Sequence, residues 1–348
     1  MMDKERLEEL LCKFSETRVA VLGDFFLDLY IHMERSLSEF SLETHKEAFQ
    51  AVALRGQPGA AGVVTNNLAA LGASYAAIGY VGQDGNGFTL KKALKAQGAD
   101  LDHLIETQDR YTPTYIKPMM EELDGSIIEL NRIDIINRSP NPEALNYLLV
   151  DQLVQAIEIC NGVLVVEQVR LDGHGVMSPV LRQALSLLAV QFPDKIFLVD
   201  SRHFAPAYQH ISLKLNIHEA IAAQHQDLQS TRIDPLSAAK DSLCALWDQN
   251  QKPVFITLGD LGVSGIDKGH FFHHPGYYIK GPVDTVGADD SVLAAIGLAL
   301  CAGATCSEAA YIGNLVGSIT VQQLGTTGVA TQQDILQRHY EYQQQMRG

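Results

Sequence analysis

The sequence is short of positive charge. Its 348 residues contain 26 Lys and Arg against 41 Asp and Glu, a net charge of −15. Nucleic acids and anionic membrane surfaces are bound by basic faces, so neither class of partner is expected. No run approaches the 18 apolar residues of a membrane-spanning helix, and the first 18 residues are charged and helical in period, unlike a secretory signal.

Cysteine is also scarce, and several catalytic motifs are missing. The five cysteines are odd in number and form no CxxC pair, which argues against a disulfide framework or a zinc site and favours a reducing cytoplasm. The histidines show no metal-ligand spacing. There is no GxSxG, no GxxxxGK[ST] and no GxGxxG that opens a helix, so hydrolase, P-loop and Rossmann functions lack their motifs.

Short apolar runs alternate with longer amphipathic segments, a pattern that predicts a mostly parallel sheet with helices on both faces. We expect one α/β sandwich domain over residues 1–348, with the polar stretch Gln224–Ser230 as a surface loop. The expected strands are 19–24, 75–81, 162–166, 195–200 and 254–258. The expected helices are 63–71, 88–97, 142–160, 178–191 and 291–302.

Two segments, 29–57 and 111–134, break this alternation. The second consists of two apolar stretches on either side of Asp124-Gly125, which predicts two strands joined by a turn. A small β lid over one edge of the sheet accounts for both segments.

A glycine turn leads directly into an apolar helix near residue 287. Free backbone N–H groups and the positive end of the helix dipole converge there, so the segment Gly287 to Asp290 is a candidate anion site. Asp290 is placed to accept a proton from a hydroxyl nucleophile. The alternative interpretation is a plain N-cap cluster formed by Asp289, Asp290 and Ser291.

Two further patterns have both a functional and a structural interpretation. Small residues from Gly59 to Gly62 let a substrate approach the backbone at the start of a helix, but such turns are common in α/β proteins. Asn216 and Glu219 share one face of a turn, a spacing suited to holding water around Mg²⁺. The second pair equally fits the start of a helix with a solvated Glu.

These segments resemble the two signatures of the PfkB family of ribokinase-like carbohydrate kinases. The second signature usually has the form Asp-Thr-x-Gly-Ala-Gly-Asp, and residues 284–290 are Asp-Thr-Val-Gly-Ala-Asp-Asp. Residues 57–87 have the order and spacing of the first. The resemblance implies an αβα sandwich with a β lid, ATP and Mg²⁺ as cofactors, and phosphoryl transfer to a sugar hydroxyl.

The same resemblance implies roles for individual residues. Asp290 is the base, with Gly287, Ala288 and Asp289 as the anion hole. The residues expected to bind the sugar are Asp28, Gly59, Ala60 and Val63. The residues expected to bind the nucleotide are Thr257, Gly259, Gly262, Asn314 and Gly325. Activation by a monovalent cation such as K⁺ is also implied, with carbonyl groups at Asp284 and Val286 as ligands, as is a homodimer formed through the lid.

Within the family, the sequence is most similar to the heptose 7-phosphate kinase branch, in residues 21–30, 66–72 and 112–117. Three positions depart from the usual pattern. Ala60 replaces the second Gly of a Gly-Gly pair, Val63 replaces an Asn, and Asp289 replaces the Gly of the anion hole. An inactive, ligand-binding relative is therefore the second hypothesis, and an interaction protein is the third. For an active kinase, we expect the Asp289 side chain to face away from the hole or toward a metal.

Overall fold

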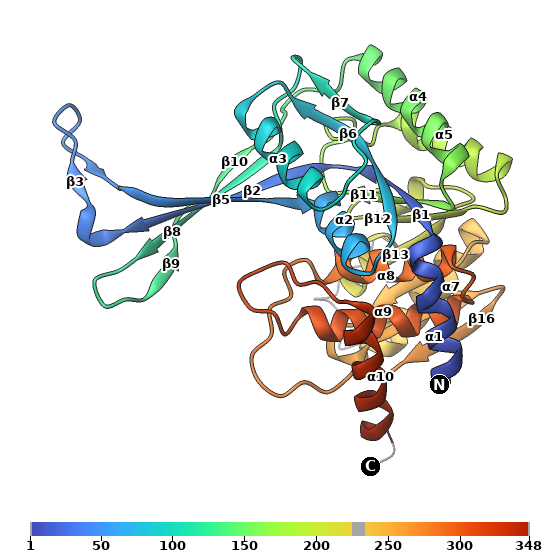
Figure 1. Cartoon of the computed structure of the whole chain (residues 1–348). Helices are drawn as coiled ribbons and strands as arrows, with labels where there is room; N and C mark the ends of the chain where they lie inside the picture. Colours follow the sequence, from blue (N-terminus) through green and yellow to red (C-terminus); the bar gives the residue numbers. More distant parts are fainter. Residues whose placement is uncertain (1, 225–233, 347–348) are drawn as a thin grey trace.

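A nine-stranded sheet forms the centre of the molecule (Figure 1). The computed structural model describes residues 2–224 and 234–346, so most of the predicted loop at Gln224–Ser230 lies outside the described residues. The strand order is β16-β15-β14-β13-β12-β11-β1-β6-β7. The strands are β1 Arg18–Gly23, β6 Ser74–Gly82, β7 Leu104–Thr107, β11 Gly162–Glu167, β12 Ile196–Ser201, β13 Ser212–Asn216, β14 Val254–Thr257, β15 Val263–Asp267 and β16 His270–His274.

The seven strands from β14 to β7 are parallel, and β15 and β16 extend the sheet as an antiparallel edge. The five strands expected from apolar runs are all present. β7, β13, β15 and β16 were not anticipated, and the sequence of β13, Ser-Leu-Lys-Leu-Asn, places a lysine in the middle of a short run. The mostly parallel sheet is as predicted.

Helices cover both faces because side chains alternate along each strand. In β1, Val19 and Val21 face one cluster while Ala20 and Leu22 face the other. The first cluster includes side chains of α1, α2, α3, α8, α9 and α10, and the second those of α4, α5, α6 and α7. The helices are α1 Lys4–Lys13, α2 Ala61–Ala70, α3 Gly85–Ala96, α4 Glu143–Ile159, α5 Pro179–Gln191, α6 Ile217–Ala222, α7 Pro235–Asn250, α8 Ala288–Cys301, α9 Cys306–Thr320 and α10 Gln332–Gln345. None of these helices, over the ranges described, has the length and apolar character needed to cross a bilayer.

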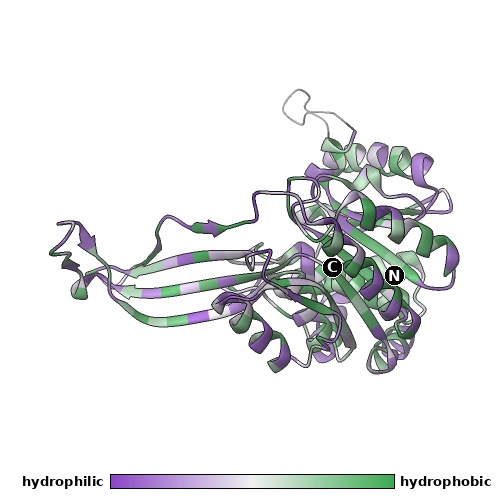
Figure 2. Ribbon diagram, turned by 90° about the horizontal axis from the view of Figure 1, so that it is seen from above, coloured by the Kyte–Doolittle hydropathy of each residue, from purple (hydrophilic) through white to green (hydrophobic). Residues whose placement is uncertain are grey.

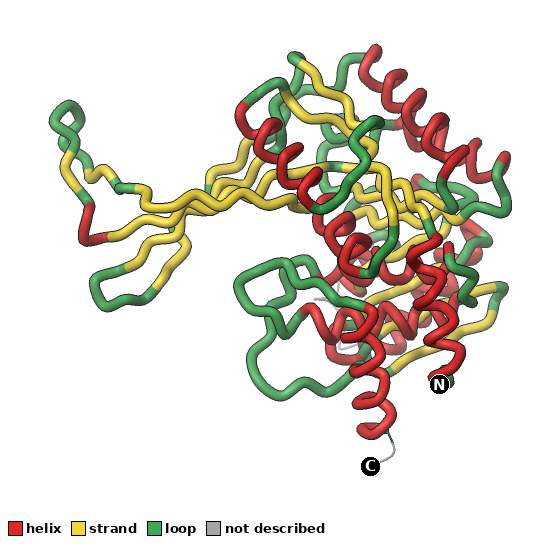
Figure 3. The backbone as a smooth tube through the Cα atoms, in the orientation of Figure 1, coloured by secondary structure: helices red, strands yellow, loops and turns green. Residues whose placement is uncertain are grey.

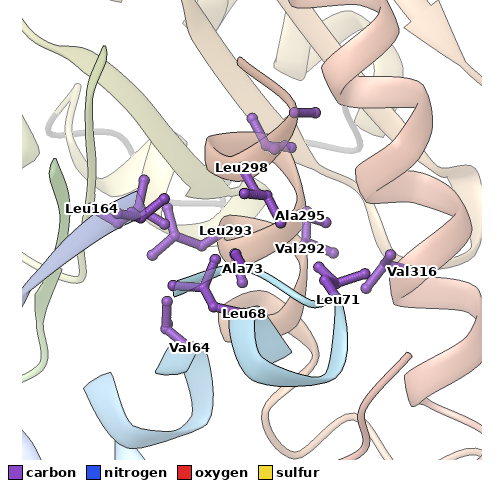
Figure 4. Packing of buried hydrophobic residues seen from close by; sticks show 14 of the residues in the cluster. Val64, Leu68, Leu71, Ala73, Leu164, Val292, Leu293, Ala295, Leu298 and Val316 are labelled. Atoms are coloured by element: carbon purple, nitrogen blue, oxygen red, sulfur yellow. The ribbon is translucent and has the colours of Figure 1, made fainter. Parts of the chain in front are cut away.

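The helix α8 is packed closely against the sheet, and this fixes the position of its N-terminus. Figure 4 shows Leu164 of β11 beside Leu293 and Leu298 of α8. A Cβ atom on Gly297 would lie 2.2 Å from Leu164 Cδ2, so only glycine allows this approach. The N-terminal turn of α8 is thereby held rigidly over the carboxyl ends of the central strands.

The lid is a second, five-stranded sheet that projects from the body (Figures 1 and 3). Its strands are β2 Phe25–Glu34, β5 Ala51–Ala60, β8 Thr114–Glu121, β9 Ile127–Glu129 and β10 Ile133–Ile135, and a short hairpin of β3 Glu39–Phe40 and β4 Glu47–Ala48 lies at its tip. The turn expected at Asp124-Gly125 is present, with Gly125 at φ 81°. The lid strand β2 begins at Phe25, four residues earlier than the segment predicted from residue 29.

The lid sheet has one polar and one apolar face, visible as alternating colours along its strands in Figure 2. Tyr30 lies opposite both Arg55 and Lys117, so these three side chains share a face. Neighbouring positions point to the other face, where Leu54 is 69% exposed and Ile133 is 58% exposed. Near the body the apolar face is covered by α3, but its distal part is open to solvent.

Candidate active site

Five polar side chains gather where parallel strands end at the same edge of the sheet. They are Glu167 of β11, Asp200 of β12, Lys214 and Asn216 of β13, and Thr257 of β14. In open α/β sheets, ligands bind at the carboxyl ends of the strands. The Glu167 carboxylate is already hydrogen-bonded within the protein, because it accepts from Arg182, Ser201 and Tyr208. The remaining four face the N-terminus of α8.

The N-terminus of α8 supplies backbone donors to this edge. Gly287 precedes the helix at φ 77°, a conformation that favours glycine. The N–H of Ala288 donates to Thr285 O at 3.1 Å and is engaged in the turn. Within the described ranges, the N–H groups of Gly287, Asp289 and Asp290 donate to no protein acceptor. The predicted anion hole therefore has its free donors on either side of Ala288.

Asp290 is a partly buried carboxyl group in the first turn of α8. Its side chain has no hydrogen-bond partner among the described protein groups. Burial, followed by the negative charge of Asp200, raises the pKa of Asp290 to about 8, while the Lys214 ammonium opposes the rise. A base with a pKa close to neutral pH can accept a proton and later release it. The environment of Asp290 suits the role predicted for it.

The Asp289 side chain faces the ends of β13 and β14. Its Oδ1 accepts from Lys214 Nζ at 2.6 Å and from Thr257 Oγ1 at 2.9 Å, and Asn216 Nδ2 lies 3.4 Å from Oδ2. Burial alone would raise the pKa of Asp289, but the Lys214 ammonium and these hydrogen bonds lower it to about 2. The sequence analysis expects this side chain to face away from the hole or toward a metal, and in the structure it turns toward the Lys214 ammonium at the ends of these strands.

Lys214 lies between two carboxylates. Its Nζ is 2.8 Å from Asp200 Oδ2 and 2.6 Å from Asp289 Oδ1, and its side chain is 0% exposed. Burial disfavours the ammonium, but both carboxylates raise the pKa of Lys214 above its ordinary value. A buried cation without partners would be costly, so this pairing is what keeps Lys214 charged inside the protein.

Asn216 and Glu219 form a capping box at the start of α6. Asn216 Oδ1 accepts from Glu219 N at 3.0 Å, and Glu219 Oε2 accepts from Asn216 N at 2.9 Å. The helix-start interpretation is thus realised in the structure, although Glu219 is not freely solvated. Burial and the charge of Asp200 raise the pKa of Glu219 to about 7. Its Oε1 atom remains available for a further ligand.

No group of three or more His, Cys, Asp or Glu side chains in the described chain forms a preassembled metal site. Mg²⁺ usually takes one or two carboxylates from the protein and completes its shell with water and substrate phosphates. Glu219 and Asn216, 3 residues apart on the rim of the anion site, are the groups that fit this role.

The acceptor side of the site is built on Asp28 and the turn before α2. The Asp28 side chain is 8% exposed, and Lys117 Nζ lies 3.3 Å from its Oδ2. Burial raises the pKa of Asp28, opposed by Lys117. A Cβ on Gly59 would lie 3.1 Å from the Asp28 carboxyl group, so this glycine keeps space above the backbone. The structure thus brings the predicted Asp28 and Gly59 together.

The two departures on the acceptor side have structural consequences. Ala60 adopts φ 52° and ψ −117°, a sparsely populated conformation that glycine adopts freely. Val63 is 2% exposed, and its Cγ1 lies 3.2 Å from the position of a Cβ built on Gly287. Val63 therefore links α2 to the anion site by apolar contact, and it offers no hydrogen bond to a sugar.

The polar face of the lid carries cations beyond Asp28. The guanidinium of Arg55 stacks over the Tyr30 ring at 4.2 Å, and Lys117 Nζ is 3.2 Å from the Tyr30 hydroxyl. Arg55 donates to Gln57 Oε1 at 3.0 Å and has no carboxylate within 4.0 Å in the described chain.

The predicted nucleotide side consists of turns with special backbone conformations. Gly259, Gly262 and Gly325 all have positive φ, at 61°, 95° and 70°. Asn314 is buried and donates to Pro275 O at 2.8 Å, so it fixes the loop after β16. Asp284 accepts from Val286 N and from Gly325 N, which ties the signature turn to the loop at Gly325.

Sequence reasoning missed Lys214 and Asp200. Their only sequence signal is a charged residue inside or at the end of an apolar run, and this signal is weak. Asp289 follows Lys214 by 75 positions, so no local spacing reveals their contact. Asp24 was also missed, although its carboxylate accepts from the N–H groups of Gln168, Val169 and Val176 and fixes the loop after β11.

Comparison with known proteins gives a consistent result. The "Bifunctional protein HldE" of Citrifermentans bemidjiense is 26% identical over 335 residues, which cover 95% of this chain and 65% of that protein. The protein of the same name from Trichlorobacter lovleyi is 28% identical over 331 residues, 94% of this chain and 64% of that protein. The chain thus spans slightly less than two thirds of the length of these relatives.

Solved structures share the fold. Escherichia coli phosphofructokinase-2 in complex with potassium has a TM-score of 0.72 at 19% identity, over 94% of this chain and 99% of that chain. Arabidopsis thaliana ribokinase complexed with ribose and ATP has a TM-score of 0.63 at 18% identity, over 92% and 98%. The model of the pfkB family carbohydrate kinases matches residues 16–333, and the chain belongs to this family.

Proposed function

We propose that this protein transfers the γ-phosphoryl group of ATP to a hydroxyl group of a sugar phosphate, with heptose 7-phosphate as the first candidate. The observation that carries the proposal is the arrangement around α8. Asp290, a carboxyl group with a pKa of about 8, lies beside the free N–H groups of Gly287 and Asp289. A base next to an anion site is the arrangement that phosphoryl transfer to a hydroxyl requires.

In the proposed reaction, the acceptor lies between Asp28 and Asp290. Asp290 accepts the hydroxyl proton while the new bond forms between the acceptor oxygen and the γ-phosphorus. The bond from the γ-phosphorus to the bridging oxygen of ADP breaks, and ADP leaves with that electron pair. The N–H groups of Gly287 and Asp289 stabilise the charge on the transferred group. Bound Mg²⁺ neutralises phosphate charge, and Asn216 and Glu219 would hold it through water.

The lid supports a phosphorylated acceptor. Tyr30, opposite Arg55 and Lys117, is two residues beyond Asp28 on β2, a separation of about 7 Å along the strand. A sugar held at Asp28 would extend toward these cations. Arg55 offers guanidinium donors that no carboxylate occupies, and a charged hydrogen bond of this kind suits a phosphate. This placement favours a sugar phosphate over a neutral sugar.

We also propose that the lid joins two copies of the chain. The distal apolar face exposes Leu54, Ile128 and Ile133 at 69%, 43% and 58%. A contiguous apolar face of this kind indicates an interaction surface, and a second lid would offer the same apolar face in return. K⁺ activation through the carbonyl groups of Asp284 and Val286, and a cytoplasmic location, remain part of the proposal.

The impaired-relative hypothesis receives less support. Asp289, the departure that motivated it, has its carboxylate engaged by the Lys214 ammonium and the Thr257 hydroxyl. The test is ATP consumption measured across a panel of sugars and their monophosphates, with and without Mg²⁺. We expect ATP turnover with a heptose or hexose phosphate and much less with the neutral sugar. The proposal is wrong if the protein binds ATP and no member of the panel stimulates its consumption.

A further inference from the structure

Three hydrogen-bond donors converge on one carboxylate at the edge of the anion site. Lys214 Nζ and Thr257 Oγ1 donate to Asp289 Oδ1 at 2.6 Å and 2.9 Å, and Asn216 Nδ2 approaches Oδ2 at 3.4 Å. The three donors come from the adjacent strands β13 and β14, whereas Asp289 reaches them from α8. An ammonium, a hydroxyl and an amide that meet at one point would bind any oxyanion placed there.

Lys214 would keep one carboxylate partner if the Asp289 side chain moved away from it. Lys214 already pairs at 2.8 Å with Asp200, whose side chain is 6% exposed. The Asp289 side chain is 45% exposed, so it covers the open side of the buried ammonium. Two carboxylates around one ammonium leave a net negative charge next to Asp290, in a region that must receive a phosphate. The second carboxylate is therefore an excess anion where a ligand anion is expected.

We propose that the Asp289 carboxylate is an internal occupant of a phosphate-oxygen subsite formed by Lys214, Thr257 and Asn216, and that a nucleotide phosphate displaces it. This inference rests on the proposed function, because that function brings a nucleotide to these residues. Rotation of the Asp289 side chain into solvent would free the three donors without moving the backbone of α8. Lys214 keeps Asp200 as its partner throughout.

Such an occupant lowers the apparent nucleotide affinity, because only the fraction of molecules with an empty subsite can bind the phosphate there. Removing its charge without changing its size should remove this competition. At saturating nucleotide the competition no longer matters, so the effect belongs to binding and not to the rate of transfer. This separates the proposal from a purely structural role for Asp289, which predicts no gain in affinity.

Calorimetric titration of the full chain with ADP, without metal and then with Mg²⁺, tests the proposal. We expect Asp289→Asn to bind ADP about tenfold more tightly than the wild type in both conditions. Asp289→Gly should tighten binding as well, and it provides a second variant if the first fails to fold. Asp241→Asn, which removes one charge from an exposed position on α7, controls for net charge and should change affinity less than twofold.

A crystal structure with a bound nucleotide is the second measurement. The proposal predicts a phosphate oxygen in contact with Lys214 Nζ and Thr257 Oγ1, and an Asp289 carboxylate that has moved away. It is overturned if Asp289 keeps its two short contacts with nucleotide bound, if it ligates Mg²⁺ directly, or if Asp289→Asn binds ADP no more tightly. In those cases sugar phosphorylation can still stand, whereas failure of every variant to bind nucleotide would refute the proposed function itself.

Discussion

Replacement of Asp290 by Asn removes the proposed base and keeps nearly the same shape. General-base catalysis typically contributes a factor of about 10² to 10⁴. We therefore expect Asp290→Asn to lower kcat by about this factor, with nucleotide affinity within a few-fold of the wild type. Asp290→Glu, which keeps a carboxylate but displaces it, should retain more activity. Both rates are measured by coupled ADP release at saturating ATP and acceptor.

The same substitution should not weaken the fold. Burial raises the pKa of Asp290 from 3.8 in the unfolded chain to about 8. Between these values the folded protein binds more protons than the unfolded chain, so this group makes stability fall as the pH rises. This pKa shift lowers the free energy of unfolding by at most roughly 4 kcal/mol at pH 7. Asp290→Asn should therefore unfold at a higher urea concentration than the wild type at pH 8, and at a similar one near pH 4.

The pH profile gives an independent test of the base. With a pKa of about 8, Asp290 is mostly protonated at pH 7 in the free enzyme. We expect kcat/KM for the acceptor to rise about tenfold between pH 7 and pH 9, and this rise should be absent in Asp290→Asn. The reasoning is refuted if Asp290→Asn retains transfer within tenfold of the wild type, or if its residual rate follows the same pH profile.

Three further predictions concern the lid and the turn before α2. Arg55→Ala should raise KM for a sugar phosphate by about tenfold to a hundredfold and leave the neutral sugar unaffected, with the exposed Arg138→Ala as control; equal effects on both acceptors would remove Arg55 from phosphate binding. Leu54→Asp should convert a dimer to a monomer in sedimentation at micromolar concentration, whereas Leu187→Asp, which changes an apolar residue of similar exposure on α5, should not; a monomeric wild type would contradict the lid dimer. Ala60→Gly should stabilise the protein by about 1 kcal/mol in urea unfolding, because it relieves the positive φ; a loss of stability would show that this backbone is not strained.

The sequence predicted those parts of the fold that depend on local pattern. Apolar runs located β1, β6, β11, β12 and β14, and periodicity located α2, α3, α4, α5 and α8 to within a few residues, whereas α6, α7, α9 and α10 were not predicted. β13 was not found, because Lys214 interrupts its apolar run and only the carboxylates of Asp200 and Asp289 make a buried lysine acceptable there. Such compensation depends on residues far away in the chain, which no local pattern records.

The candidate site was predicted to a similar extent. The glycine turn and the following helix identified the region of Asp290, since helix termini present free N–H groups wherever they occur. The direction of the Asp289 side chain was not predictable, because its partners come from β13 and β14. The strained backbone of Ala60 was likewise invisible until the φ angle was known, although the missing glycine marked the position.

The most direct test of the central claim is transfer of label from γ-³²P-ATP to a sugar phosphate. Heptose 7-phosphate and fructose 6-phosphate are incubated separately with the wild type and with Asp290→Asn in the presence of Mg²⁺ and K⁺, and the sugar products are separated and counted. The account predicts a labelled sugar bisphosphate with the wild type and at least a hundredfold less with Asp290→Asn. It is contradicted if the wild type binds ATP and no acceptor becomes labelled, or if both proteins label the same sugar at the same rate.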